Sequence, residues 1–271
     1  MKINTALLWI FSFVFTLAIA YYQRKTGPTH PMTGKVEIAG QTVKYKLIRS
    51  HGGLDDATIR LKDIPGIIGG EVKFKRLGTQ DEWTSVMMSR DGQDITANLP
   101  HQPPAGKLIY QVTLKSGDQS VLINSDPTVI RFKGDVPAWV LIPHIIIMFT
   151  AMMMSTRTGL EALARKGKAY KYALITMVTL FVGGLILGPV VQKYAFGAFW
   201  TGWPFGQDMT DNKTLVAFIF WAIAVWRLKK NPGNRTWPVI AMIVLLMVYL
   251  IPHSMFGSEL DYSSGEIQTG R

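Results

Sequence analysis

Five long apolar runs constrain the fold of this chain more than any other feature of its sequence. They cover residues 5–22, 137–155, 172–191, 214–226 and 237–255. A membrane-spanning helix needs about 20 mostly apolar residues, and every run except 214–226 comes close to that length. The pattern predicts a polytopic α-helical membrane protein whose membrane domain, residues 136–257, contains four helices.

The first run, residues 5–22, has two interpretations. Lys2 precedes it, and Ala18-Ile19-Ala20 has the A-x-A pattern of a signal-peptide cleavage site. Its length of about 18 residues also approaches that of a retained transmembrane anchor, which is the interpretation we favour. Either one sends the chain after residue 22 to the outer side of the membrane.

Basic residues between the apolar runs predict the orientation of the chain. Residues 157–171 and 227–235 carry much of the net charge of +11. Connections rich in Lys and Arg face the cytoplasm, so the expected location is a bacterial inner membrane. The inserted domain, the 193–213 loop and the tail (258–271) are then periplasmic. A charge distributed in this way argues against nucleic acid as a partner.

Residues 34–135, reached through a linker at 23–33, read as an inserted extracytoplasmic all-β domain. Apolar and polar residues alternate in 35–38 and 41–47, with the turn Ala39-Gly40 between them, which predicts a hairpin. Further strands are expected at 57–61, 70–76, 84–89, 94–99, 107–114, 119–124 and 129–132. Short strands at this spacing predict a β-sandwich.

Trp83, the Leu99-Pro100 step and the run PPAGKLIYQVTL (103–114) give this domain a family resemblance. Residues 34–132 resemble a fibronectin-III or immunoglobulin-like module. The resemblance implies a β-sandwich and brings no binding residues with it.

The tetrapeptide Leu-Ile-Pro-His occurs twice, ending at His144 and at His253. The predicted topology places both histidines in the outer half of the membrane, on antiparallel segments. Neutral imidazoles on two helices can hold a b-type haem or a divalent metal between them. The alternative is that each histidine bonds a neighbouring carbonyl or a lipid headgroup.

Four carboxylates, Asp208, Asp211, Glu259 and Asp261, are expected on the same outer face as His253. Together they form a possible site for Zn, Mn or Fe. No HExxH spacing accompanies them. Helix capping by the two aspartates and a solvated acidic tail are the interpretations that we prefer.

The connection from 193 to 213 is dense in aromatic residues and glycines. Its candidate partner-binding residues are Trp200, Gly202, Trp203, Phe205 and Lys213. An interfacial aromatic belt is the simpler interpretation, but the glycines also predict tight turns and a folded loop. Before this loop, Gly184 and Gly188 form a GxxxG pattern typical of close helix packing.

No motif in the sequence names a reaction. The chain has no Cys and no GxxxxGK[ST], GxGxxG or GxSxG pattern. We therefore expect a non-catalytic accessory, assembly or partner-binding subunit of an envelope complex, with membrane lipids and other membrane or periplasmic proteins as partners. One alternative is a haem- or metal-binding redox protein that uses His144 and His253. Another is a small-molecule or lipid site under the 197–213 loop.

Overall fold

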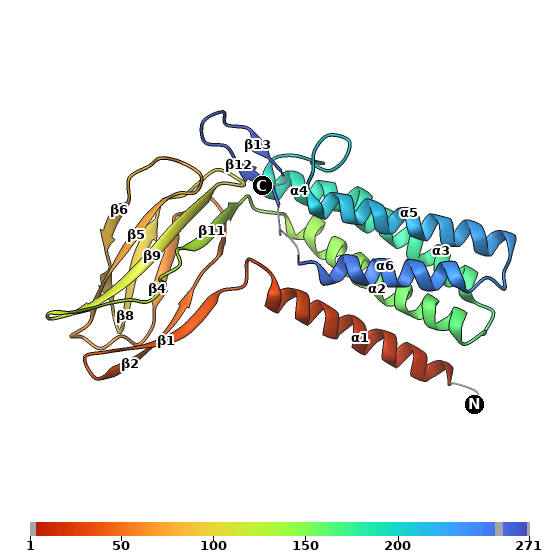
Figure 1. Ribbon diagram of the computed structural model, residues 1–271, viewed down its shortest axis with the longest axis horizontal. Helices are drawn as coiled ribbons and strands as arrows, with labels where there is room; N and C mark the ends of the chain where they lie inside the picture. Colours follow the sequence, from red (N-terminus) through yellow and green to blue (C-terminus); the bar gives the residue numbers. More distant parts are fainter. Residues whose placement is uncertain (1–3, 253–256, 270–271) are drawn as a thin grey trace. The chain divides into compact units, whose positions relative to one another are not determined.

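The apolar runs form helices and the alternating segments form strands in the computed structural model, which describes residues 4–252 and 257–269. The chain divides into two units, which Figure 1 shows as a set of helices and a set of sheets. The helical unit contains Met1–Gly27, Val136–Gly257 and Thr269–Arg271. The β unit contains Pro28–Asp135 and Ser258–Gln268.

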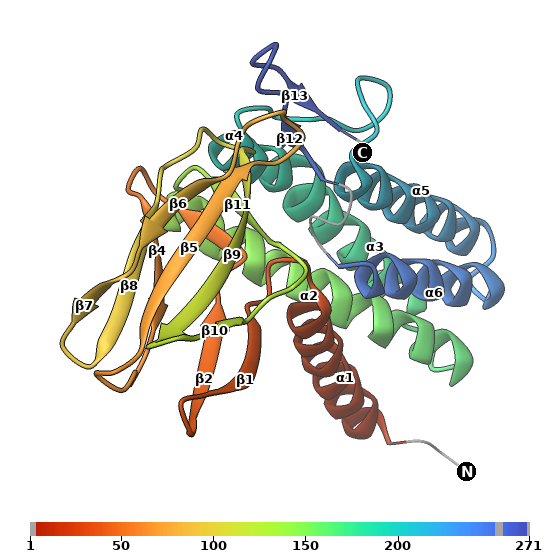
Figure 2. The same ribbon diagram turned by 60° about the vertical axis from the view of Figure 1, so that its left-hand side comes forward.

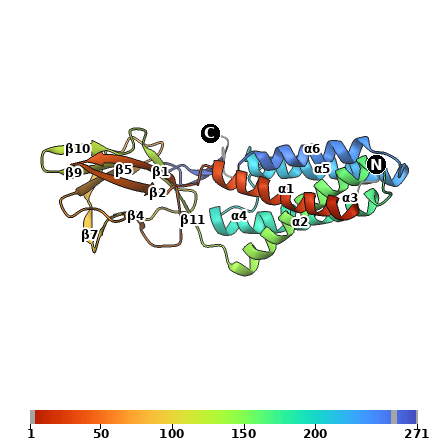
Figure 3. The ribbon, with the colours of Figure 1, turned by 90° about the horizontal axis from the view of Figure 1, so that it is seen from below.

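The described part of the helical unit contains six α-helices and one π-helix. They are α1 (Thr5–Thr26), α2 (Ala138–Leu163), α3 (Ala169–Leu180), the π-helix η1 (Phe181–Leu187), α4 (Gly188–Phe196), α5 (Met209–Lys230) and α6 (Thr236–Leu250). Helix α2 contacts α1, α3 and α6, and α5 contacts α3 and α6 (Figures 1 and 3).

Local chemistry sets the ends of these helices. The side chain of Asn4 accepts the Ala6 N–H and caps α1, and Asp208 caps α5 in the same way through Thr210. Helix α4 ends at Gly197, whose φ of +87° is the left-handed conformation that glycine adopts most easily. Small residues and Trp221 of α5 form much of the core between α2, α3, α5 and α6.

Three helical stretches are long and apolar enough to cross a membrane: Thr5–Thr26, Ala138–Leu163 and Ala169–Phe196. They correspond to the first three predicted runs. Helix α6 is apolar but shorter, at 15 residues. The three spans identify a membrane protein, in agreement with the prediction from sequence.

Helix α2 runs further than the sequence pattern indicated. Its apolar run was predicted to end near residue 155, with Arg157 in a basic connection, but the helix continues to Leu163. Arg157 is wholly buried inside it. The prediction was wrong because the hydropathy of Arg157 does not report the partners that bury it.

The two larger sheets of the β unit share one hydrophobic core, to which a separate two-stranded hairpin also contributes, and this arrangement fits the predicted β-sandwich. One sheet has the order β3-β11-β9-β5-β6, with β10 also pairing with β9, and the other has the order β4-β8-β7 (Figure 2). Their strands are β3 (Ser50–Gly52), β4 (Ala57–Leu61), β5 (Gly69–Arg76), β6 (Thr84–Met87), β7 (Ser89–Asp91), β8 (Asp94–Leu99), β9 (Lys107–Ser116), β10 (Gln119–Leu122) and β11 (Thr128–Lys133).

The hairpin β1 (Met32–Ile38) and β2 (Gln41–Leu47) confirms the predicted turn. Ile38 pairs with Gln41, so the loop is Ala39-Gly40, and both of these residues have positive φ. Two positive φ values are the requirement of a type I′ hairpin turn.

Two segments of the β unit differ from the expected strands. The strand predicted at 84–89 is two strands in different sheets, because β6 pairs with β5 whereas β7 pairs with β8. The other segment is the tail, which the sequence indicated only as a solvated acidic segment. It forms the hairpin β12 (Glu259–Leu260) and β13 (Ile267–Gln268), which belongs to the β unit.

Candidate functional site

The connection from Gly197 to Asp208, called the aromatic loop below, is a hydrogen-bonded structure. The backbone N–H of Asp208 donates to the Thr201 carbonyl at 2.9 Å, and the N–H groups of Phe205 and Gly206 both donate to the Gly202 carbonyl at 2.9 Å. The loop therefore folds back on itself before α5 begins.

The first turn of α5 holds this loop through two side chains. An Asp211 Oδ2 atom accepts the Thr201 N–H at 2.7 Å, and the Asn212 Oδ1 atom accepts the Trp203 N–H at 2.6 Å. From α4, Gln192 donates to the Thr201 hydroxyl at 2.6 Å. Asp211 is 6% exposed. A buried carboxylate that accepts backbone N–H groups is a strong constraint on loop conformation.

Gly202 is required where the loop crosses α5. A Cβ atom at Gly202 would lie 2.6 Å from the Asp211 Cβ and 2.8 Å from the Asn212 Oδ1. Both neighbours are the side chains that fix the loop, so neither can move away without releasing it. The close approach of this backbone to α5 therefore depends on the missing side chain.

The loop presents three large aromatic side chains outward. Phe199 is 56% exposed, Trp203 70% and Phe205 83%. Trp200 instead uses its indole N–H to donate to the Trp203 carbonyl at 3.1 Å, within the loop. A rigid backbone thus carries an apolar surface that the helical unit itself does not cover.

Lys213 fixes a second segment of the helical unit. Its ammonium group is largely buried and donates to the Ile251 carbonyl at 2.8 Å. Ile251 follows α6 directly, so this bond holds the chain where α6 ends. It satisfies one orphan carbonyl of that helix end.

Of the histidines in the two Leu-Ile-Pro-His copies, the structure describes His144 but not His253. The His144 Nδ1 lies 3.0 Å from the Gly183 carbonyl of η1, and His253 lies outside the described residues. Because a carbonyl only accepts, Nδ1 carries the proton and a neutral ring has its lone pair on Nε2. This is the tautomer of a metal-ligating histidine oriented by a backbone carbonyl. It is equally the carbonyl bond of the simpler interpretation.

The candidate carboxylates fall into the two different units. Asp208 and Asp211 belong to the helical unit, where they cap α5 and hold the aromatic loop. Glu259 and Asp261 belong to the β unit. Across residues 4–252 and 257–269, no group of three or more His, Cys, Asp or Glu side chains is arranged to hold a metal ion.

The tail carboxylates have structural partners within the β unit. Glu259 pairs with the Lys107 ammonium at 2.5 Å, and Asp261 accepts N–H and O–H groups of Ser263 in the hairpin turn. Burial lowers the pKa of Lys107, and the Glu259 carboxylate partly opposes that shift. The tail is thereby attached to β9.

The glycines of the GxxxG region pack inside the chain. A Cβ at Gly184 would lie 2.6 Å from Thr214 of α5, and one at Gly183 would lie 2.9 Å from Ile147 and Met148 of α2. Gly188 has more room, since the nearest atom would be 3.6 Å away. The π-helical turn therefore packs closely between α2 and α5.

Sequence analysis missed a buried charged cluster formed by Arg157. Its guanidinium lies 5.2 Å from the Trp9 ring and 5.0 Å from the Tyr172 ring. Glu161, four residues along α2, lies 2.6 Å from it and is 1% exposed. An i, i+4 Arg and Glu pair was the available signal, but it does not by itself distinguish a surface pair from a buried one.

The Arg157 cluster is held by charge and rings more than by hydrogen bonds. The ion pair lacks hydrogen-bond geometry, and the Arg157 nitrogens have no hydrogen-bond partner among the described residues. The other Glu161 oxygen accepts the Lys168 N–H at 3.1 Å, just before α3. Cation–π contacts with two aromatic rings compensate part of the lost hydration.

These elements define the general class: a membrane protein that combines apolar helices long enough to span a bilayer with a β unit. Comparisons of the chain with protein-family models, with curated proteins and with solved structures found no match.

Proposed function

We propose that this protein is a non-catalytic, partner-binding accessory subunit of a complex in a bacterial inner membrane. In this proposal the aromatic loop is the recognition element and faces the periplasm. The observation that carries the proposal is the contrast between a loop backbone fixed by Asp211 and Asn212 and the exposure of Trp203 and Phe205 at 70% and 83%.

This contrast favours recognition of a protein over a simple interfacial belt. Aromatic side chains dominate the binding energy of protein interfaces. A preformed loop also loses little conformational entropy when it binds. A belt requires aromatic side chains at the right depth, but it requires neither buried carboxylate anchors nor Gly202.

The strand order of the β unit supports the finer assignment to an immunoglobulin-like sandwich. Sheets β4-β8-β7 and β3-β11-β9-β5-β6 correspond to a B-E-D sheet and an A′-G-F-C-C′ sheet of that fold. Such domains are frequent recognition modules, which agrees with an accessory role by analogy of fold alone.

Site-specific photo-cross-linking in native membranes tests the proposal. A photoreactive residue at position 205 is expected to give a protein adduct, whereas one at Trp139, an equally exposed aromatic (72%) at the start of α2, is not. Gly202→Val is expected to abolish the adduct from position 205. Lipid adducts alone at both positions would show that the loop is a membrane belt.

A second candidate function is haem or metal binding through His144. It is favoured by the His144–Gly183 bond, which orients the ring and leaves Nε2 unprotonated. Absorption spectra of the purified protein test it. A reducible Soret band that disappears in His144→Ala supports it, and featureless spectra with no bound metal reject it.

A further inference from the structure

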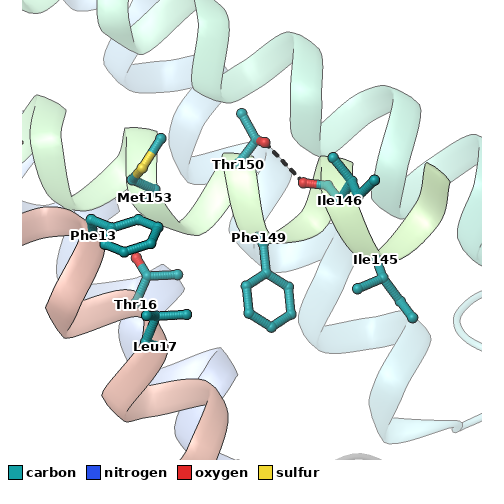
Figure 4. A pocket seen from close by; sticks show the side chains of 8 residues that line it. All are labelled: Phe13, Thr16, Leu17, Ile145, Ile146, Phe149, Thr150 and Met153. Carbon is teal, nitrogen blue, oxygen red and sulfur yellow. Dashed lines mark hydrogen bonds between the residues drawn. The ribbon is translucent and has the colours of Figure 1, made fainter. Parts of the chain in front are cut away.

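An apolar groove of about 350 Å³ lies between α1 and α2 within the helical unit. Figure 4 shows its two walls. Phe13, Thr16 and Leu17 come from α1, and the α2 wall includes Phe149 and Thr150. Both helices are long and apolar enough to cross a membrane, so the groove belongs to the part of the protein that faces the bilayer core.

The groove offers its occupant almost no free hydrogen-bond donors. The Thr16 hydroxyl donates to the Ser12 carbonyl at 2.8 Å, and the Thr150 hydroxyl donates to the Ile146 carbonyl at 2.8 Å (Figure 4). Both hydroxyl protons are thus used within their own helices. A polar ligand would lose its hydration without compensation here, whereas an apolar chain would not.

The size of the lining side chains argues against a second transmembrane helix as the occupant. Close helix packing in membranes uses Gly, Ala and Ser, which allow backbones to approach. The groove is instead lined by large side chains, including Phe13, Phe149 and Met153. A thin, flexible acyl chain fits between such side chains better than a helix does.

Positive charge lies at one end of this helix pair. The Lys166 ammonium group donates to the Thr5 hydroxyl at 2.9 Å, which places Lys166 beside the start of α1. Arg165 and Lys168 are exposed in the same connection. The acidic residue nearby, Glu161, is buried against Arg157 and does not offset this charge at the surface.

The near edge of the groove lies at a depth that an acyl chain starting at this end reaches, and its far edge on α1, at Leu17, is 12 residues from Thr5, about 18 Å. Thr5 and Phe13 are eight residues apart on α1, about 12 Å at 1.5 Å per residue. One leaflet is about 15 Å deep, half of the hydrocarbon core. A headgroup near Lys166 therefore sends the end of its acyl chain into the groove.

We propose that the α1–α2 groove binds an acyl chain of an anionic phospholipid whose phosphate lies on Lys166 and the adjacent basic residues. The groove accepts the chain by its shape and apolar lining, and the basic connection selects the headgroup by charge. This site is separate from the aromatic loop and independent of the function proposed for it.

Native mass spectrometry of the full-length protein in mild detergent tests this site. After delipidation, the protein is incubated with phosphatidylglycerol or with phosphatidylcholine. We expect retention of phosphatidylglycerol in preference to phosphatidylcholine. Thr150→Trp, which fills the groove, should weaken retention about tenfold, a factor equivalent to about 1.4 kcal/mol. The control Val14→Trp, at an exposed position of α1 outside the groove lining, should leave it unchanged.

The headgroup contact has its own pair of variants. Lys166→Gln removes one basic charge near the surface, worth about 1 kcal/mol, so phosphatidylglycerol retention should fall about fivefold. Lys229→Gln, in the basic last turn of α5, should have no effect. Should a variant fail to fold, a photoreactive-acyl phosphatidylglycerol is applied to the wild-type protein, and adducts should map to groove residues.

Four results overturn the proposal. They are no retained phospholipid, equal retention of the two lipids, unchanged retention by Thr150→Trp, and adducts that map outside the groove. Recovery of a neutral isoprenoid from the groove, in place of the phospholipid, would overturn it as well. Cross-linking from position 205 is unaffected by any of these results, so the two proposals fail separately.

Discussion

Removing one member of the buried Arg157–Glu161 pair is expected to destabilise the helical unit strongly. Glu161→Gln keeps the shape of the side chain and an oxygen that can accept the Lys168 N–H, but it removes the negative charge. Arg157 is 0% exposed and has no hydrogen-bond partner among the described residues. Its charge then lacks compensation from a carboxylate.

The expected cost follows from the burial of both side chains. Breaking a buried ion pair from one side costs about 3–5 kcal/mol. The Trp9 and Tyr172 rings stay in place and retain part of the stabilisation of the guanidinium. We therefore expect the lower end, about 3 kcal/mol, for Glu161→Gln. The double variant Arg157→Met/Glu161→Gln should lie within about 1 kcal/mol of the wild type, because no buried charge is left.

Tryptophan fluorescence during denaturant unfolding in detergent can measure this. Of the eight tryptophans, Trp83 lies in the β unit and the other seven lie in the helical unit. A Trp83→Phe background therefore reports the helical unit alone. Asp81→Asn, which breaks the partly exposed pair with Arg76 in the β unit, serves as the control and should leave this transition unchanged.

Comparing the two single variants with the double variant forms a double-mutant cycle, and two outcomes of it would refute this reasoning. Additive effects of Arg157→Met and Glu161→Gln would show that the two side chains do not interact energetically. A loss below about 1 kcal/mol for Glu161→Gln, the range of exposed pairs, would show that water reaches Arg157.

Four further predictions concern other parts of the chain. Gly202→Ala should release the aromatic loop, since its Cβ would meet Asp211 at 2.6 Å, and limited proteolysis should then cut residues 197–208 faster than in the wild type. Tyr262→Phe should lower the stability of the β unit by about 1–3 kcal/mol, because its hydroxyl both accepts the Lys107 N–H and donates to the Lys107 carbonyl; thermal unfolding measured by circular dichroism checks this. Three carboxylates of the β unit have pKa values held below their ordinary values of 4.5, 3.8 and 3.8 by basic partners: Glu71 by Lys115, Asp81 by Arg76 and Asp94 by Arg60. Their ionised forms therefore stabilise the β unit above those pH values, and its melting temperature should fall as the pH drops below about 4.5. The intact mass of the membrane-extracted protein should include residues 1–20, because cleavage after Ala20 would remove the contact of Trp9 with Arg157 and the hydrogen bond of Thr5 with Lys166. A mass short by those residues would show that the first run is a signal peptide.

Most secondary structure followed from the sequence because its signals are local. An apolar run of about 20 residues can bury itself only as a helix in a bilayer. Alternation in 41–47 and the turn at Ala39-Gly40 specify a hairpin from neighbouring residues alone. The boundaries were less certain where a charged residue is buried, as the extension of α2 past Arg157 shows.

The candidate site could be located from sequence but not built from it. The density of glycines and aromatics in 193–213 indicated a folded loop. Which side chains hold that loop depends on the return of α5, which brings Asp211 to Thr201 and Asn212 to Trp203. Composition does not show where α5 returns to the loop. From the sequence alone, a helix cap such as Asp208 or a loop-holding residue such as Asp211 therefore could not be told apart from a metal ligand.

The sequence by itself determined three helices long and apolar enough to span a membrane, the separate β unit and the β1–β2 turn, because hydropathy, alternation and turn chemistry act over a few residues. Only the tertiary structure decided the roles of the charged groups. Arg157 is buried because Trp9 and Tyr172 come from two other helices, and Glu259 docks on Lys107 from 152 positions away. A charge is stabilised by whatever lies within a few ångströms of it, and the fold, rather than the order of residues, brings those partners together.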